Sequence, residues 1–134
     1  MKPTSDSNSD RTLKWWASDA VVYFVAAAQP PIAVKIGVTK WDSVARRLSH
    51  LQSSNHERLE LLGVIPFRGS EQPMREAEDR ERELHQTFRQ HQRFPEGTRG
   101  YEWFTANPSL IRYIEEHTTE PEALGFPRFI QVAG

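Results

Sequence analysis

Two short apolar stretches decide the fold of this chain, Val21-Val22-Tyr23-Phe24-Val25 and Ala33-Val34-Lys35-Ile36-Gly37-Val38. The first consists of β-branched and aromatic residues, and in the second Val and Ile alternate with other side chains, so both patterns predict β-strands. Gln29-Pro30-Pro31 between them cannot continue a hydrogen-bonded ladder and predicts a loop. A hairpin symmetric about Gln29 would place Tyr23 opposite Lys35 on one face of a sheet. The hairpin alone favours the simpler explanation that Tyr23 is a half-buried strand aromatic and Lys35 a solubilising charge.

A helix with an apolar stripe is predicted after the second strand, with Asp42 as its N-cap. The stripe has members at i, i+4 and i+7, namely Val44, Leu48 and Leu51. At roughly 100° per residue, Arg47 falls at the edge of the stripe, whereas Arg46 and His50 point towards solvent. Arg47 is therefore the better candidate for a site on the sheet, and an ordinary surface cation is the alternative for either arginine.

The stretch from Ser70 to about Gln92 predicts a second helix, in which Glu81 occupies an unusual position. Its apolar face is formed by Met74, Ala77, Leu84 and Phe88. Glu81 lies within that face and Glu83 points away from it, while His85 lies one turn further on, beside Glu81. An ionised carboxylate on an apolar face is costly unless it is paired, hydrogen-bonded or bound to a metal. Glu81 is thus either part of a boundary salt bridge or a functional residue.

Composition limits the classes of function without choosing one. The chain has 134 residues, a formal net charge of −1 and no cysteine, so we expect one domain without disulfides, iron–sulfur clusters or cysteine-bound zinc. A chain without a global positive charge is not expected to bind nucleic acid tightly and indiscriminately, and a local basic site would be needed. The sequence has neither a signal-peptide pattern nor a transmembrane run, which makes a cytoplasmic protein without membrane association the default expectation.

The sequence divides into a polar tail at residues 1–12, predicted to be disordered, a domain at residues 13–117, and an extension at residues 118–134. Trp15 and Trp16 are predicted to cover one end of the core, with base stacking as the less favoured alternative. Asn107-Pro108 predicts the cap and first turn of a last helix. The extension is expected to dock on the domain, with an added edge strand or a partner contact as alternatives.

Taken together, these pieces resemble the GIY-YIG nuclease superfamily, in particular its phage-type branch, whose second motif often reads Lys-Ile-Gly. The resemblance covers roughly residues 21–114. The matching pieces are Val22-Tyr23-Phe24, Lys35-Ile36-Gly37, Arg46-Arg47-Leu48 with Leu51-Gln52, Leu59-Glu60-Leu61-Leu62, Glu81 with Leu84-His85 and Phe88, and Glu102-Trp103-Phe104.

The resemblance implies an α+β fold, a small three-stranded antiparallel sheet flanked by helices, and an endonuclease that hydrolyses DNA with one divalent metal, Mg²⁺ or Mn²⁺. By the same resemblance Tyr23 would act as base or proton relay, and Arg47 would stabilise the phosphoryl oxygens. Glu81 would bind the metal, and His85 would contact substrate or support the site. Trp103 and Phe104 are expected to pack on the sheet.

The chain departs from the family at two motifs. The first lacks the usual glycine and isoleucine but keeps Tyr23, and the second has Lys35 in place of a tyrosine, where it would clamp phosphate as a point charge. The alternative is therefore a catalytically degenerate module that binds nucleic acid or protein, and a more distant one is a small-molecule acid–base enzyme using Glu81 and His85. The expected partner is DNA, single-stranded or duplex, with RNA as a further candidate, and the sequence makes no prediction of oligomeric state. Further candidate contacts to nucleic acid are Arg46, His50, Arg93 and Arg99.

Overall fold

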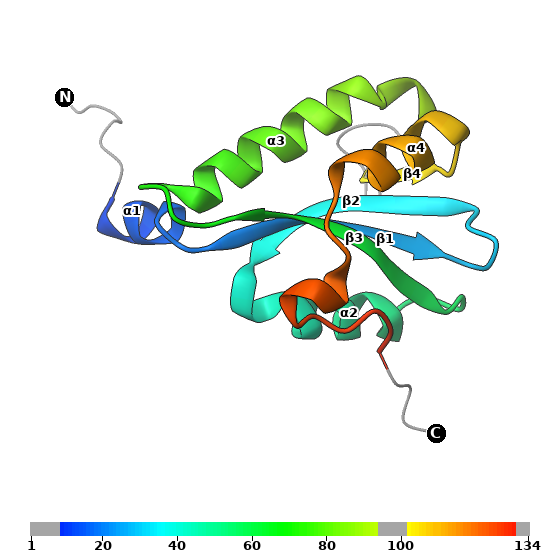
Figure 1. Cartoon of the computed structure of the whole chain (residues 1–134), viewed down its shortest axis with the longest axis horizontal. Helices are drawn as coiled ribbons and strands as arrows, with labels where there is room; N and C mark the ends of the chain where they lie inside the picture. Colours follow the sequence, from blue (N-terminus) through cyan, green and yellow to red (C-terminus); the bar gives the residue numbers. More distant parts are fainter. Residues whose placement is uncertain (1–8, 94–101, 131–134) are drawn as a thin grey trace.

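The computed structural model describes residues 9–93 and 102–130 and has an α+β fold (Figure 1). None of its helices is long and apolar enough to cross a lipid bilayer. In chain order the elements are α1 (Asp10–Trp16), β1 (Ala20–Ala27), β2 (Ala33–Lys40), η1 (Trp41–Ser43), α2 (Val44–Ser53), β3 (Leu59–Phe67), α3 (Pro73–Thr87), η2 (Arg89–His91), β4 (Trp103–Thr105), α4 (Pro108–His117) and η3 (Pro121–Leu124).

The strands form one antiparallel sheet in the order β3-β1-β2-β4. The expectation of three strands is therefore wrong, because the described part of the chain contributes a fourth. Trp103 and Phe104 are themselves part of this strand, β4. It pairs with Ala33–Lys35 at the outer edge of β2, so the two residues join the sheet at its edge. A three-residue strand at a sheet edge is too short to show a periodic pattern, so no local signal predicts it.

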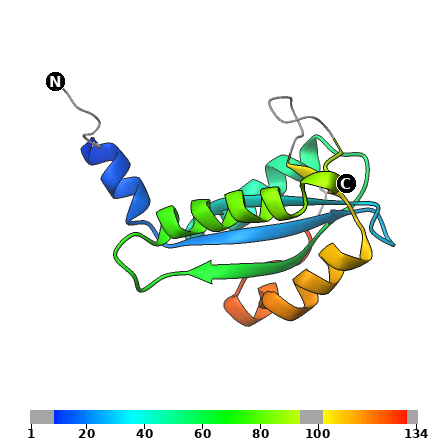
Figure 2. The same cartoon turned by 90° about the horizontal axis from the view of Figure 1, so that it is seen from above.

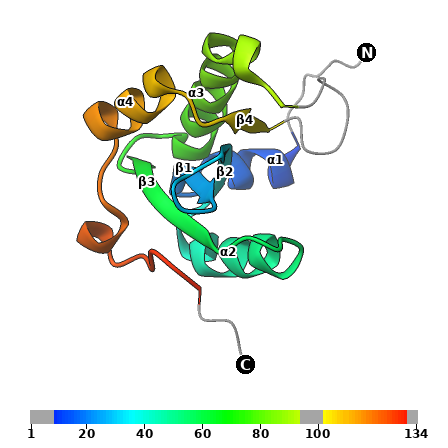
Figure 3. The same cartoon turned by 90° about the vertical axis from the view of Figure 1, so that its right-hand side faces the viewer.

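Helices cover both faces of the sheet, and this explains why all of β1 is apolar. Figure 3 shows α3 and α4 on one face and α2 with the C-terminal segment on the other. Val22 and Phe24 face the first layer, whereas Val21, Tyr23 and Val25 face the second. A central strand buried on both sides reads as a continuous apolar run, as observed here. Figure 2 shows α3 lying along the sheet, where it contacts β1 and β2.

The β1–β2 hairpin differs from its predicted register by two residues. Ala27 pairs with Ala33 and the Ile32 N–H donates to the Ala27 carbonyl oxygen at 3.0 Å, so the loop is centred on Pro30, not on Gln29. Tyr23 therefore lies opposite Gly37, not Lys35. Because the side-chain period of a strand is two, a shift of two residues leaves Tyr23 and Lys35 on the same face as diagonal neighbours.

The predicted helices are present, with some different bounds. The stretch predicted as one helix from Ser70 to about Gln92 contains α3 over Pro73–Thr87 and the separate 3₁₀ turn η2 over Arg89–His91. Asp42 is not the N-cap of α2, because it lies within the short 3₁₀ turn η1, and Ser43 occupies the cap position without a side-chain hydrogen bond. The stripe of α3 is buried as predicted at Met74, Ala77, Leu84 and Phe88. Asn107 caps α4, since its Oδ1 accepts from the backbone N–H groups of Ser109 and Leu110, both at 3.1 Å.

Helix α1 corrects two expectations about the N-terminal region. It begins at Asp10 with a Ser9 cap, so the last three residues of the tail predicted to be disordered are helical, and residues 1–8 lie outside the described part. No residue of α1 is buried, and Trp15 is 41% exposed. Trp15 therefore does not cover the core, because α1 packs beside α3 and away from the sheet interior.

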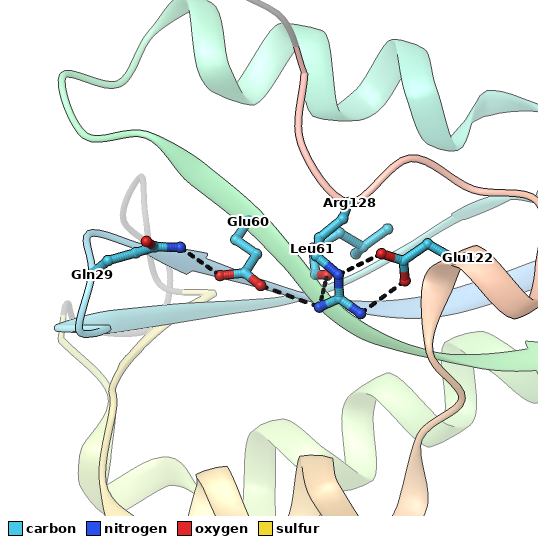
Figure 4. A network of polar contacts seen from close by, with 5 residues as sticks. All are labelled: Gln29, Glu60, Leu61, Glu122 and Arg128. Carbon is cyan, nitrogen blue, oxygen red and sulfur yellow. Dashed lines mark hydrogen bonds and ion pairs between the residues drawn. The ribbon is translucent and has the colours of Figure 1, made fainter.

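Residues 118–130 run along the outer side of β3, which is the side that does not pair with β1. The Leu61 N–H donates to the Arg128 carbonyl oxygen at 2.8 Å, and Thr119 forms a bridge with Val64. The Arg128 guanidinium donates to Glu122 at 2.7 and 2.8 Å and to Glu60 at 3.2 Å (Figure 4). These contacts satisfy backbone groups that a sheet edge would otherwise expose.

Candidate functional site

The candidate site lies at the edge of β2 beyond the short strand β4. The last contact along this edge is the Ile36 N–H, which donates to the Glu102 carbonyl oxygen at 3.1 Å. From residue 37 to residue 40 no other strand within the described ranges pairs with this edge. Helix α2 lies on one face here and α3 on the other. Side chains from both layers can therefore meet around an open strand edge.

Tyr23 reaches this edge from the central strand. Its side chain belongs to the core on the α2 face, it is 3% exposed, and its ring lies across Gly37. A Cβ atom at Gly37 would lie 2.9 Å from the Tyr23 Cε1 atom and closer still to Cζ and the hydroxyl oxygen, so only glycine permits this approach. The phenol thus extends from β1 over β2, with its hydroxyl above Gly37.

Lys35 is buried on the same face and pairs with Glu102. Their side chains are 10% and 29% exposed, and the Lys35 ammonium donates to Glu102 Oε1 in an ion pair. Glu102 belongs to a motif of the sequence in which no role is predicted for it. The two residues are 67 positions apart, so no local pattern connects them, and the only available signal was the Glu102-Trp103-Phe104 motif itself.

Glu81 is half-buried on α3, as its place in the apolar face predicts, whereas Glu83 is exposed. Burial is the main cause that raises the pKa of Glu81 to about 7, the neighbouring carboxylate of Glu102 contributes to this rise, and Lys35 opposes it. Among the described residues no cation lies within salt-bridge distance of Glu81. The boundary salt bridge considered from the sequence is therefore not formed, and the carboxyl group faces a hollow of about 540 Å³.

Electrostatic interactions connect Tyr23 with the other predicted residues. Burial is the main cause that raises the pKa of Tyr23 well above its usual range. The exposed Arg47 guanidinium lowers it, and the carboxylates of Glu102 and Glu81 raise it. Side chains from β1, α2 and α3, together with Glu102 next to β4, are thus close enough to influence one proton.

His85 lies beside Glu81 in the wall of the same hollow. Its Nε2 atom is 2.9 Å from the Ile36 carbonyl oxygen, and because a carbonyl only accepts, this nitrogen carries the proton. The ring also packs edge-on against Phe104, with centroids 5.3 Å apart. His85 therefore ties α3 to β2.

The remaining predicted contacts separate into three groups. Arg46 and His50 are exposed and line a second hollow together with Arg47. Arg93 is exposed beyond η2, where its N–H donates to the Trp103 carbonyl oxygen at 2.9 Å, and it lines neither hollow. Arg99 and the proline- and glycine-containing loop around it lie outside the described residues. Trp15 and Lys40 also line the second hollow, and the sequence analysis did not place them at the site.

Glu102→Gln is expected to destabilise the protein by about 1–3 kcal/mol, because it leaves the mostly buried Lys35 ammonium without its anionic partner. Urea unfolding at pH 7 measures this difference. Asp79→Asn is the matched control, since it breaks an ion pair to Arg82 at 2.9 Å that is exposed on both sides and should change stability by less than about 1 kcal/mol. Equal effects of the two substitutions would contradict a structural role for the buried pair.

The donor set for a metal is small. No group of three or more His, Cys, Asp or Glu side chains suited to a metal occurs within residues 9–93 and 102–130. Two carboxylates are near one another at this site, since the charge of Glu102, after burial, contributes to the raised pKa of Glu81. In comparisons with known proteins, no family model, no curated protein and no solved structure matches this chain.

Proposed function

We propose that this chain is a divalent-metal-dependent endonuclease of the GIY-YIG type that hydrolyses phosphodiester bonds in DNA. One observation carries the proposal. Four predicted residues come from separate parts of the sequence, namely Tyr23, Lys35, Arg47 and Glu81. At a single strand edge, Arg47 and Glu81 influence the pKa of Tyr23, and Lys35 influences that of Glu81. Residues chosen only for local reasons would not be expected to gather in this way.

The arrangement supplies the groups that phosphodiester hydrolysis needs. Arg47 and Lys35 offer positive charge for the phosphoryl oxygens, on which negative charge develops in the transition state. Tyr23 offers a hydroxyl that can pass a proton between the attacking water and its surroundings. Because burial keeps this phenol protonated, we assign it to proton relay and not to a resting phenolate base.

The residues present fit a hard divalent cation. Glu81 is a carboxylate that burial keeps partly protonated, and a bound cation would favour its charged form. Mg²⁺ is commonly held by one or two carboxylates while waters and substrate phosphate provide the other ligands, so Glu81, with Glu102 nearby, suffices. When bound, Mg²⁺ or Mn²⁺ would supply Lewis-acid stabilisation of the phosphoryl group.

A binding module without catalysis is the second candidate, and the burial of two proposed reactive groups favours it. Tyr23 is 3% exposed, and Lys35 is engaged by Glu102. The small-molecule acid–base enzyme has less support, because the hollow beside Glu81 and His85 is lined mainly by charged and amide side chains. A deep apolar pocket would be typical of that class.

A cleavage assay with the purified chain tests the proposal. Single-stranded, duplex and branched DNA and single-stranded RNA are each incubated with Mg²⁺, with Mn²⁺ or with EDTA, and products are resolved on denaturing gels. We expect cleavage of at least one DNA substrate with metal and none with EDTA. Absence of metal-dependent cleavage on every substrate would overturn the nuclease, and binding without cleavage would establish the module.

A further inference from the structure

A positively charged groove extends from the candidate site along α2. It has a volume of about 510 Å³ and is lined by Lys40, Arg46, Arg47 and His50, with Asp42 as the one acidic group in its wall. Within the described part of the chain none of the three permanent cations takes part in an ion pair. A chain with a net charge of −1 therefore concentrates uncompensated positive charge here.

Trp15 forms one wall of this groove, and its ring is held in place while remaining open to solvent. It is 41% exposed, whereas the other three tryptophans are more buried. The indole N–H donates to a Glu78 carboxylate oxygen at 2.8 Å, and Trp16 donates to the other oxygen at 3.3 Å. An exposed aromatic ring that is already oriented loses little conformational freedom when a flat ligand stacks on it.

Cations beside a fixed aromatic face are the combination that binds single-stranded nucleic acid. Lys and Arg side chains follow the phosphates, and an unpaired base stacks on the ring. A base within a duplex has no free face for Trp15 unless it is first unstacked. An acidic peptide would use the cations but not the indole, so the tryptophan distinguishes the two partners.

We infer that the groove lined by Trp15, Lys40, Arg46 and Arg47 binds a nucleic-acid strand carrying at least one unpaired base and leads it to the candidate site. The inference deepens the proposed function and rests on it, because Arg47 belongs to both the groove and the cluster around Tyr23. The substrate class is then single-stranded DNA, or duplex DNA with a displaced base, in preference to intact duplex.

Fluorescence anisotropy in EDTA tests this inference without cleavage. A labelled oligothymidylate of about ten nucleotides, which falls within the site size of small binding domains, is compared with its duplex and with unlabelled polyglutamate as competitor. We expect the single strand to bind several-fold more tightly than the duplex and to resist polyglutamate. Absence of binding, or equal affinity for single strand and duplex, would overturn the inference.

Variants separate stacking from charge. Trp15→Ala is expected to weaken binding of the single strand by roughly tenfold or more, and Trp15→Phe by less than about threefold. Leu13→Ala is the matched control, because Leu13 is 42% exposed on the same helix and does not line the groove. Since α1 contributes no buried residue, these substitutions should leave the circular dichroism spectrum unchanged. Unaltered affinity in Trp15→Ala would overturn the stacking assignment.

Charge is tested through the salt dependence of binding. Lys40→Ala is expected to lower the slope of log K against log salt by about 0.7, the value for one phosphate contact on a single strand. Arg112→Ala on α4 is the control, because that arginine is exposed and does not line the groove. An unchanged slope in Lys40→Ala would contradict the phosphate path. If the strand binds as predicted while no DNA or RNA substrate is cut with Mg²⁺ or Mn²⁺, the nuclease is overturned and the groove assignment stays in place.

Discussion

Glu81→Gln is expected to lower metal-dependent DNA cleavage by roughly 10³-fold, because an amide cannot supply the negative charge that holds a divalent cation. Glu83→Gln is the matched control on the same helix. Glu83 is exposed, and its carboxylate pairs with Arg80 at 3.5 Å. Its substitution should keep activity within about twofold, since exposed pairs of this kind contribute little. Comparable losses in the two variants would mean that Glu81 has no special role.

The same substitution should stabilise the metal-free protein at alkaline pH. Burial raises the pKa of Glu81 from 4.5 to about 7, so between these values the folded protein binds a proton that the unfolded chain releases. The free energy of unfolding therefore falls as pH rises through this window. The full loss of stability, caused by the charged carboxylate of Glu81, is present above pH 7. Allowing for partial exposure, the cost is about 1–2 kcal/mol at pH 8.

Urea unfolding at two pH values measures this effect. Glu81→Gln should be more stable than the original protein at pH 8 and nearly equal to it at pH 4.5, where the folded carboxyl group is protonated and the unfolded one is half so. Added Mg²⁺ or Mn²⁺ should raise the thermal midpoint of the original protein and leave that of Glu81→Gln unchanged, since only a state that binds the ion is stabilised. If metal raised the thermal midpoint of Glu81→Gln as much as that of the original protein, Glu81 would not be the metal ligand.

Local patterns predicted the parts of the fold that depend on local physics. The apolar run in β1, the stripe of α3 and the Asn107 cap of α4 each follow from residues within a few positions of one another. The predictions that failed required information from elsewhere in the chain. Asp42 suits a cap, but the 3₁₀ turn η1 moves the cap to Ser43, one residue later, and the hairpin register depends on how a loop with two prolines closes.

The residues of the candidate site also divide into those that a local pattern predicts and those that depend on distant parts of the chain. Glu81 was identified because an acidic residue in an apolar face is costly wherever that helix packs, and Arg47 because it flanks a buried stripe. Glu102 is given no role by the sequence, and base stacking by Trp15 is only the less favoured alternative there. Their partners Lys35 and Glu78 are 67 and 63 positions away, where no local pattern reaches. A motif can mark such a residue, but only the folded chain shows which partner it meets.

Tyr23→Phe is expected to reduce cleavage by roughly 10²–10⁴-fold, the usual range for losing a group that transfers a proton. The ring is retained, so its burial in the core with Val44 and Leu48 and its approach to Gly37 are retained as well. The free energy of unfolding should therefore change by less than about 1 kcal/mol. Single-turnover cleavage and urea unfolding of the same preparation measure the two quantities.

Two further variants separate the hydroxyl from the ring that carries it. Gly37→Ala forces a methyl group against the Tyr23 ring, so it should lose activity and also about 1–3 kcal/mol of stability, as overpacked cores do. Tyr113→Phe is the control, because Tyr113 packs on Phe24 and Phe88 in the opposite layer, and cleavage should be unaffected. Binding of the oligothymidylate in EDTA should be the same for Tyr23→Phe as for the original protein, so the defect must appear in the rate of the chemical step. Cleavage by Tyr23→Phe at the original rate would remove the phenol from the proton path and would require another group at the β2 edge to accept the proton of the attacking water.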